Sequence, residues 1–113
     1  MMADDGSSLL AEATGFDWDD GNAPKVVDRH DVEPGECEQA FFREPFVVSH
    51  DPGHSTLERR WRALGQTAAG RRLLLVLTMR GTLIRVLAAR EMNRKERRHY
   101  AEISARTESD PHL

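Results

Sequence analysis

The sequence predicts one small α+β domain, with two short helices near the N-terminus, an antiparallel β-meander and a basic C-terminal helix. Three observations support this fold class. A length of 113 residues is enough for a single modest core. Apolar residues recur with a helical period up to residue 42 and with an extended period over residues 45–90. After residue 92, a helix-capping pattern coincides with a dense cluster of basic side chains.

Both ends of the chain are expected to lie outside the folded domain. Residues 1–15 are small and polar without periodicity, which predicts a disordered extension, and residues 107–113 predict a flexible tail. The domain itself is expected over residues 16–106. It opens with Phe16-Asp17-Trp18, where the alternation of apolar and polar side chains indicates a short strand.

Two short helices should follow this strand. Asp19 or Asp20 can cap the first helix, expected over residues 21–32, because Pro24 is tolerated only in the first turn. The second helix begins after Glu33 and has the sequence PGECEQAFF. One face of it carries Cys37, Ala40 and Phe41.

The extended segments predict a sheet of four or five antiparallel strands joined by short loops. A strand over residues 45–50 ends at the turn DPGHS. The next strand, over residues 59–65, alternates between two faces. One face should carry Trp61 and Ala63, and the other Arg60, Arg62 and Leu64.

Two more strands complete the predicted meander. Residues 71–79 are almost continuously apolar, as expected of a central strand covered on both faces. Arg80-Gly81 predicts a tight turn, since glycine adopts a positive φ at little cost. In the last strand, over residues 82–90, one face should carry Leu83, Arg85 and Leu87, and the other Ile84, Val86 and Ala88.

The C-terminal helix is expected over residues 94–106. Asn93 and Glu96 form a capping-box pattern at its start, and Tyr100 and Ile103 form a narrow apolar stripe. The segment from the end of the last strand through the first turns of this helix is strongly basic. Its basic side chains are Arg90, Arg94, Lys95, Arg97 and Arg98.

Charge is distributed very unevenly along the chain. Residues 1–54 contain 3 Lys/Arg and 13 Asp/Glu, a net charge of −10, whereas residues 55–113 contain 13 and 6, a net charge of +7. Either the two halves neutralise each other, or the basic half faces an external anion, most commonly a nucleic acid. A basic face that is simply solvated is the third interpretation.

Other features of the sequence argue against several classes of protein. The longest apolar run, residues 73–77, is far shorter than the ~20 residues of a membrane-spanning helix. The N-terminal residues do not have the pattern of a signal peptide. Cys37 is the single cysteine, so an internal disulfide is impossible. We therefore expect a cytoplasmic protein without membrane contact.

Four segments resemble the BrnT family of toxins in order and spacing. They are FDWDDGNAPK, HDPGHS with the following ERRW, GRRLLLVLTMRG and IRVLAAREMNRKERRHYAE. The resemblance extends from Phe16 to Glu102. The last segment is the most specific, because a strand-ending arginine followed by Met-Asn-Arg-Lys-Glu-Arg-Arg and a tyrosine is rare by chance.

The resemblance implies a RelE-like fold and a ribonuclease that cleaves RNA without a metal or another cofactor, inhibits translation and arrests growth. It also implies the toxin half of a type II toxin–antitoxin system. The expected partner is a ribbon-helix-helix antitoxin of the BrnA type, with two toxins on an antitoxin dimer. Operator DNA would be bound only through that antitoxin.

Three positions depart from the pattern of the family. Asp31 stands where the family commonly has glycine, Val26 where it often has asparagine, and Ala88 where it often has serine. An aspartate is less favourable than glycine in a left-handed helix cap. The alternative function is therefore an inactivated toxin homologue that acts as an antitoxin-binding corepressor.

Cleavage of RNA without a metal needs a base for the 2′-hydroxyl, cations for the phosphate and an acid for the leaving 5′-oxygen. Arg90 and Arg80, at the ends of the last two strands, are the candidates for the phosphate, since a guanidinium group pairs with phosphate oxygens. Glu58 and His54 are the candidates for proton transfer. The structural alternatives are an ion pair of Arg90 with Glu91 or Glu96, a turn role for Arg80 and His54, and a local ion pair for Glu58.

Further basic residues are candidates for RNA binding. Arg60 projects from the neighbouring strand, and Lys25 matches the lysine of the family. The helix contributes Arg94, Lys95 and Arg98. Trp18 and Trp61 could stack on bases, although a core role or a contact with the antitoxin is the alternative for both, and Trp61 is a candidate anchor for the antitoxin. His50, Asp51 and His54 do not make a convincing metal site, because no further ligand is fixed near them.

Overall fold

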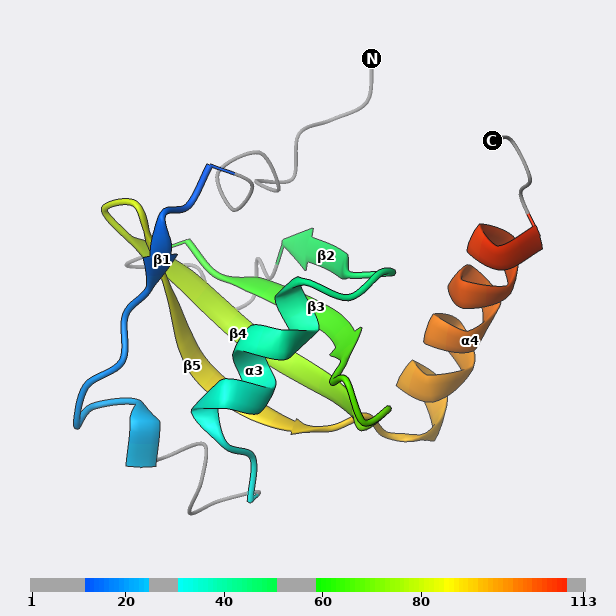
Figure 1. The fold of residues 1–113 in the computed structure, drawn as a ribbon, viewed down its shortest axis with the longest axis horizontal. Helices are drawn as coiled ribbons and strands as arrows, with labels where there is room; N and C mark the ends of the chain where they lie inside the picture. Colours follow the sequence, from blue (N-terminus) through cyan, green and yellow to red (C-terminus); the bar gives the residue numbers. More distant parts are fainter. Residues whose placement is uncertain (1–11, 25–30, 51–58, 110–113) are drawn as a thin grey trace.

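The computed structural model describes residues 12–24, 31–50 and 59–109, and it confirms a small α+β domain built on one sheet. Figure 1 shows helix α3 across one face of the sheet and helix α4 beside it. The strands lie in the order β1-β5-β4-β3-β2. Their bounds are β1 Gly15–Phe16, β2 Val47–His50, β3 Trp61–Gln66, β4 Arg72–Arg80 and β5 Leu83–Glu91.

Strands β2 to β5 form the predicted antiparallel meander, but β1 corrects the expectation of a purely antiparallel sheet. β1 pairs with β5 in parallel, with Phe16 opposite Ile84. The backbone N–H groups of Thr14 and Asp17 extend this pairing, donating to the carbonyls of Thr82 and Ile84 at 2.8 Å each. A parallel pair needs a long crossover connection, and here the chain between β1 and β5 includes α3. The short apolar alternation around β1 does not reveal the direction in which β1 pairs.

The two faces of the sheet bury different clusters of side chains. The larger cluster includes Leu73, Leu75, Leu77 and Val86, and it lies beneath α3 (Pro34–Phe41). The smaller cluster lies on the other face, because Leu74 alternates with Leu73 and Leu75 along β4. It contains Leu64, Leu74, Met92 and Tyr100, the last from α4 (Arg94–Ser109).

A β-bulge corrects the predicted faces of β5. The register shifts between Val76 and Leu77, so that Val76 lies opposite Ala88 and Leu77 lies opposite Val86. The extra residue on β5 reverses the alternation beyond it. Ala89 is therefore buried with Val86, whereas Ala88, which was expected on that face, is exposed.

Helix α3 agrees with its prediction. Glu33 and Glu36 form a capping box around Pro34, and Cys37 and Ala40 are buried against the sheet. The expectation of two complete N-terminal helices is not matched. Among the described residues of the first, Ala23 and Pro24 are helical, and residues 25–30 lie outside the described part. The two helices with described bounds lie mid-chain and at the C-terminus. Asp31 adopts a φ of 56°, the left-handed conformation that glycine would favour.

Helix α4 begins with the predicted capping box and runs to Ser109, beyond the predicted end at Arg106. The Asn93 N–H donates to Glu96 Oε1 at 2.9 Å, and the Glu96 N–H donates to Asn93 Oδ1 at 2.8 Å. Tyr100 is buried, and its hydroxyl donates to the carbonyl of Pro45 at 2.7 Å. The helix is thus tied to the sheet mainly by its first half.

The N-terminal boundary of the domain lies earlier than predicted. Ala13 packs against the larger core cluster, and Thr14 is hydrogen-bonded to Thr82, so both residues, expected in the extension, belong to the folded part. Residues 1–11 and 110–113 lie outside the described residues. Within the described ranges, no helix is both long and apolar enough to cross a membrane.

Candidate phosphate-binding site

Arg90, Arg62 and Glu96 meet on the sheet face that α4 covers only in part. The Nη1 and Nη2 atoms of Arg90 donate to Glu96 Oε1 and Oε2 at 2.8 and 2.9 Å, a bidentate ion pair. Arg62 Nη2 lies 3.5 Å from Glu96 Oε2. The side chain of Glu96 is 15% exposed, that of Arg90 33% and that of Arg62 45%. One carboxylate therefore holds two guanidinium groups at the surface.

The electrostatics favour the charged forms of Glu96 and Arg90. The hydrogen bonds from Arg90 lower the pKa of the Glu96 carboxyl, burial opposes this shift, and the capping N–H of Asn93 adds to it. The same hydrogen bonds raise the pKa of the Arg90 guanidinium. The cluster consequently has two positive charges and one negative charge, and it retains a net charge of +1.

A cavity of about 150 Å³ opens beside this cluster. Arg62 and Glu96 form part of its wall, and His99 lies one helical turn beyond Glu96 on α4. The rest of the wall combines apolar side chains with one hydroxyl, from Val47, Ser49, Leu64 and Leu74. The wall of the cavity therefore brings one guanidinium group, a carboxylate, an imidazole and a hydroxyl group to one place.

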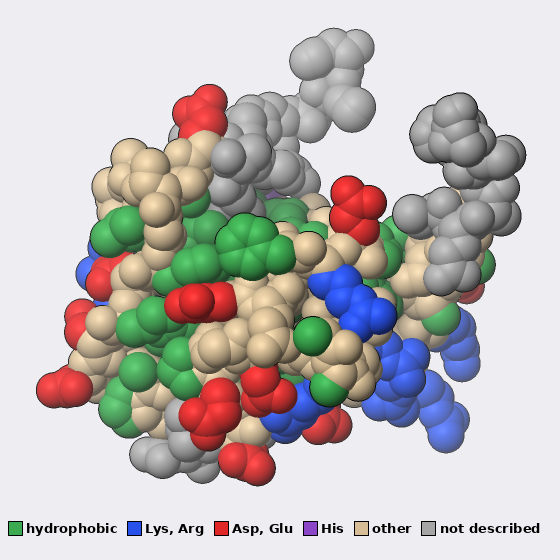
Figure 2. Space-filling view, viewed as in Figure 1, with side chains coloured by type: hydrophobic (Ala, Val, Ile, Leu, Met, Phe, Trp, Pro, Cys, Tyr) green, Lys and Arg blue, Asp and Glu red, His purple; other side chains and the backbone are tan. Residues whose placement is uncertain are grey.

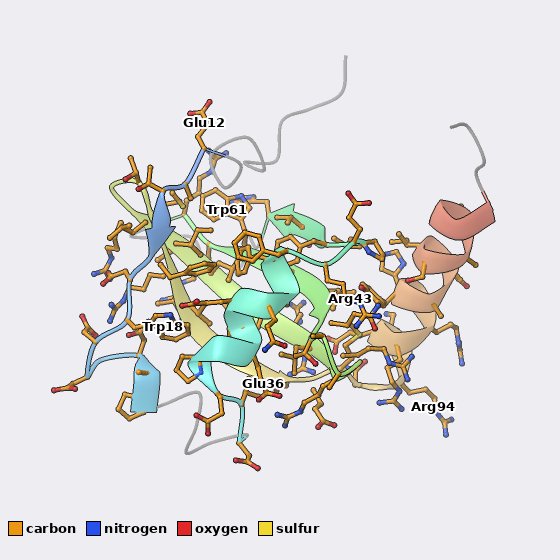
Figure 3. The ribbon with its side chains drawn as sticks, in the orientation of Figure 1. Glu12, Trp18, Glu36, Arg43, Trp61 and Arg94 are labelled. Atoms are coloured by element: carbon orange, nitrogen blue, oxygen red, sulfur yellow. The ribbon has the colours of Figure 1, made fainter. Side chains whose placement is uncertain are left out.

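The first two turns of α4 add positive charge around the site. Arg94, Lys95 and Arg98 are exposed, and Figure 3 shows Arg94 pointing away from the sheet. Cations near a helix N-terminus are unfavourable by about 0.3–1 kcal/mol each, because the helix dipole is positive there. Their position reduces stability but strengthens the local attraction for an anion.

The structure does not place Arg80 in the same site as Arg90. Because β4 and β5 are antiparallel, Arg80 lies opposite Leu83 at one end of the hairpin, and Arg90 lies opposite Leu74 at the other. At ~3.3 Å per residue, the seven steps from Leu83 to Arg90 span about 23 Å. The expected common surface of Arg60, Arg80 and Arg90 is therefore wrong for Arg80.

The other candidates divide into two groups. Arg60 is half-buried just before β3, two residues from Arg62. Glu58, His54 and Lys25 lie outside the described residues. Asp51 and His54, which were weighed with His50 as metal ligands, also lie outside the described residues. Within the described ranges, no group of three His, Cys, Asp or Glu side chains could hold a metal ion.

Sequence reasoning did not identify Arg62 and Glu96 as site residues. Arg62 was visible only as a neighbour of Arg60 on the polar face of a strand, and Glu96 only as a capping residue or an alternative partner of Arg90. The spacing of six residues between Arg90 and Glu96 crosses a strand-to-helix corner, and no periodic pattern connects them. His99, which lines the cavity, was not among the predicted site residues either.

The two tryptophans differ in burial, and both make contacts within the fold. Trp61 is 1% exposed, so the idea that it anchors an antitoxin is wrong for this conformation. Trp18 is half-buried and donates from Nε1 to Glu38 Oε2 at 2.8 Å, which ties the segment after β1 to α3. Both side chains stabilise the fold.

The described residues thus form a small α+β domain in which two arginines, a carboxylate and a histidine lie at or beside an open cavity. The comparison with protein families then agrees with the resemblance seen in the sequence. The chain belongs to the BrnT family, described as the ribonuclease toxin of a type II toxin–antitoxin system, whose model matches residues 18–96. No curated protein matches the chain.

Proposed function

We propose that this protein is a toxin that cleaves RNA without a metal ion at the Arg62–Glu96–Arg90 cluster, and that it arrests growth by inhibiting translation. Membership in a family of ribonuclease toxins supports the reaction class. The observation that supports this location is the bidentate Arg90–Glu96 pair with Arg62 beside it, at the edge of a cavity.

The pair is suited to a phosphate because a carboxylate and a phosphate accept hydrogen bonds in the same planar, bidentate geometry. A guanidinium group has five N–H donors. Those of Arg90 reach Glu96 twice and the Glu91 carbonyl once, at 3.1 Å. The remaining donors and the more exposed Arg62 can hold the nonbridging oxygens as negative charge develops in the transition state.

Proton transfer needs a second group near the phosphate. His99 lines the cavity, and histidine is the side chain used most often for general acid–base catalysis. Glu58 and His54 remain candidates for the complementary role, as proposed from the sequence. In this scheme Glu96 is a positioning residue, since its carboxylate is engaged by two arginines and its lowered pKa makes it a weak base.

The test is an RNA cleavage assay of the purified protein in the presence of EDTA. We expect cleavage by the native chain and a loss of about 10²-fold for Arg62→Ala. Arg106→Ala, also on the exposed surface but in the last turn of α4, is the matched control and should retain activity. A folded native protein that leaves RNA intact would favour the alternative function, an inactivated corepressor. The observation that supports this alternative is that Glu96 already pairs with Arg90 and neutralises its charge.

We further propose that the protein partner expected of a type II toxin is a BrnA-type ribbon-helix-helix antitoxin, with two toxins on its dimer. An acidic segment of this antitoxin would cover Arg60, Arg62 and Arg90, because charge complementarity speeds association and masks the site. Co-purification with the product of the neighbouring gene, followed by light scattering, measures the stoichiometry. A toxin that remains monodisperse beside that product would overturn the assignment of the partner.

A further inference from the structure

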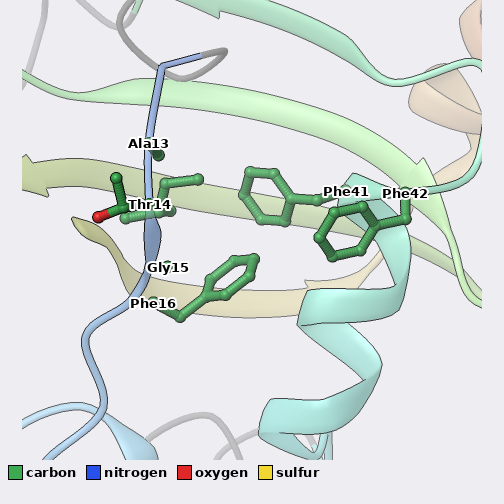
Figure 4. A pocket seen from close by; sticks show the side chains of 7 residues that line it. Ala13, Thr14, Gly15, Phe16, Phe41 and Phe42 are labelled. Carbon is green, nitrogen blue, oxygen red and sulfur yellow. The ribbon is translucent and has the colours of Figure 1, made fainter. Parts of the chain in front are cut away.

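A second cavity, of about 350 Å³, lies far from the arginine cluster, between β1 and α3. Its lining is mainly apolar, from Ala13, Phe16, Phe41, Phe42 and Ile84. Figure 4 shows Phe41 and Phe42 at the end of α3 on one side of the opening, and β1 with Phe16 on the other. We refer to this cavity as the aromatic groove.

The three rings are already arranged around one another. The centroids of Phe16 and Phe41 are 5.1 Å apart in an edge-to-face arrangement, and those of Phe16 and Phe42 are 6.4 Å apart. Phe42 is nevertheless 81% exposed. No other large apolar side chain in the described part of the chain is largely exposed to solvent. An aromatic side chain at the edge of an apolar cavity is a typical anchor point for a partner protein.

The surroundings of the groove are acidic. Glu12 is exposed next to Ala13, Glu44 is exposed two residues after Phe42, and Glu38 lies one turn before Phe41 and Phe42. Helix α3 itself contains no Lys or Arg. Figure 2 shows hydrophobic side chains gathered over this face with acidic ones beside them, while Lys and Arg gather toward α4.

The nearest cation in sequence does not neutralise this edge. Arg43 directs its Nη1 to the backbone carbonyls of Thr67 and Ala68, at 2.6 and 3.1 Å, beyond the end of β3. Figure 3 shows Arg43 on the side of α3 that faces α4, away from Trp18 and β1. A ligand in the aromatic groove would therefore meet apolar surface bordered by negative charge.

The aromatic groove and the arginine cluster lie on opposite faces of the sheet. Ile84 of the groove belongs to the core cluster beneath α3, whereas Leu64 and Leu74 beside the arginine cluster belong to the cluster beneath α4. A partner bound in the groove would leave Arg62 and Arg90 accessible. The groove therefore serves a different purpose from the masking of the phosphate-binding site.

We infer that the aromatic groove binds a segment of the protein antitoxin in which a leucine- or phenylalanine-sized side chain is flanked by lysine or arginine. The choice of the antitoxin rests on the proposed function, whereas the chemistry of the segment rests on the groove itself. A second copy of this chain could offer its basic α4. However, a two-fold dimer would need each chain to present its groove and its α4 to the partner at the same time, whereas the two lie against opposite faces of the sheet.

A photocrosslinking amino acid in place of Phe42 tests the identity of the occupant. Benzoylphenylalanine at this position, in the complex of the full chain with its co-expressed antitoxin, should form an adduct with the antitoxin at an apolar residue next to Lys or Arg. The same amino acid at Ala88, which is exposed on the opposite face, is the matched control and should not label that segment. An adduct at Phe42 with a second copy of the chain, with residues 1–11, or with an acidic segment would overturn the inference.

Binding measurements separate this inference from the proposed enzymatic function. Phe42→Ser should weaken the antitoxin complex at least tenfold in titration calorimetry and leave RNA cleavage by the free toxin unchanged, with Ala69→Ser, in the exposed turn after β3, as the control for both. Glu44→Gln should weaken the complex less, and mainly at low salt. Unchanged affinity of Phe42→Ser would overturn the groove assignment. Absence of cleavage in all variants, with Phe42→Ser still weakening the complex, would overturn only the enzymatic function.

Discussion

At the scale of single residues, Arg90 and the arginines of α4 should have separable roles. Arg90 is fixed by the sheet and by Glu96, so it can be preorganised for a phosphate, whereas Arg94 extends into solvent and attracts RNA without positioning it. We expect Arg90→Ala to lower cleavage by about 10²-fold or more, and Arg94→Ala to weaken binding only modestly. Single-turnover cleavage and an RNA-binding titration measure the two effects.

Folding has to be checked in this comparison, because Arg90 also connects the end of β5 to the start of α4. Arg90→Lys keeps the positive charge but cannot form the bidentate pair. It should remain folded by circular dichroism and yet lose most of the activity. Full cleavage by a folded Arg90→Ala protein, with activity abolished by Arg94→Ala, would reverse the assignment of roles.

Glu96→Gln should separate binding from catalysis. The substitution preserves the size of the side chain and removes the charge that holds Arg62 and Arg90. RNA should then bind more tightly, because the site gains one net positive charge, while kcat falls about tenfold or more because the arginines lose their fixed positions. Steady-state kinetics would show a lower KM together with a lower kcat. A higher kcat would mean that Glu96 only inhibits the site.

The candidate site was predictable at this scale only in part. The sequence pointed to Arg90 because that residue ends a strand and matches the pattern of the family. It could not point to Arg62 and Glu96 together, because their contact depends on how α4 turns back over the sheet. The rejection of Arg80 depends on strand register, since the ends of two consecutive antiparallel strands lie at opposite ends of their hairpin.

At the scale of elements, an ion-pair cluster attaches the segment after β1 to β5. Arg85 is 7% exposed, and its guanidinium donates to Asp19 at 2.9 and 3.1 Å and to Asp17 at 3.2 Å. The hydrogen bond from Arg85 lowers the pKa of the Asp19 carboxyl below its ordinary value of 3.8, and the N–H of Gly21 contributes. This attachment should therefore weaken in acid.

A carboxyl group whose pKa is lowered by folding stabilises the native state fully above its unfolded pKa, and this stabilisation is lost as the pH falls below that value. The melting temperature should therefore decrease more between pH 6 and pH 3 in the native chain than in Asp19→Asn. Asp20→Asn, at the exposed neighbouring position, is the control and should follow the native chain. Parallel pH profiles for the native chain and Asp19→Asn would contradict this attribution.

The attachment of α4 gives a second prediction for an element. Tyr100→Phe removes the hydroxyl that donates to the Pro45 carbonyl and leaves that carbonyl without this donor. We expect a loss of about 1 kcal/mol in the free energy of unfolding. This corresponds to a decrease of about 4–8 °C in the melting temperature of a domain of this size. An unchanged melting temperature would show that water replaces the hydroxyl at no cost.

The elements themselves were mostly predictable, because each has a local signal. The Glu33-Pro34 start with its apolar face, the capping pair Asn93–Glu96 and the apolar run of β4 located α3, α4 and the central strand. The parallel direction of β1 and the bulge opposite Val76 have no such signal. The direction of β1 depends on pairing with a strand far along the chain, and the bulge depends on a shift of register within the β4–β5 hairpin, so the exposure of Ala88 was missed.

At the scale of the whole molecule, the separation of charge along the sequence becomes a separation in space. The acidic half of the chain provides β1, α3 and the aromatic groove, and the basic half provides the arginine cluster and α4 (Figure 2). Ion pairs such as Arg71 with Glu36 connect the two halves in places, but they do not neutralise the α4 side. Of the three interpretations of the basic half, an external anion therefore agrees best with the structure.

The salt dependence of RNA binding should report this arrangement quantitatively. Arg62, Arg90, Arg94, Lys95 and Arg98 provide five positive charges, and Glu96 offsets one. With a factor of ~0.7 per neutralised phosphate for single strands, the slope of log K against log salt concentration should be about −3. Glu96→Gln should steepen it to about −3.5, and Phe42→Ser, on the opposite face, should leave it unchanged. Fluorescence anisotropy with a single-stranded RNA measures the slope, and a value near zero would show that the basic half does not contact RNA.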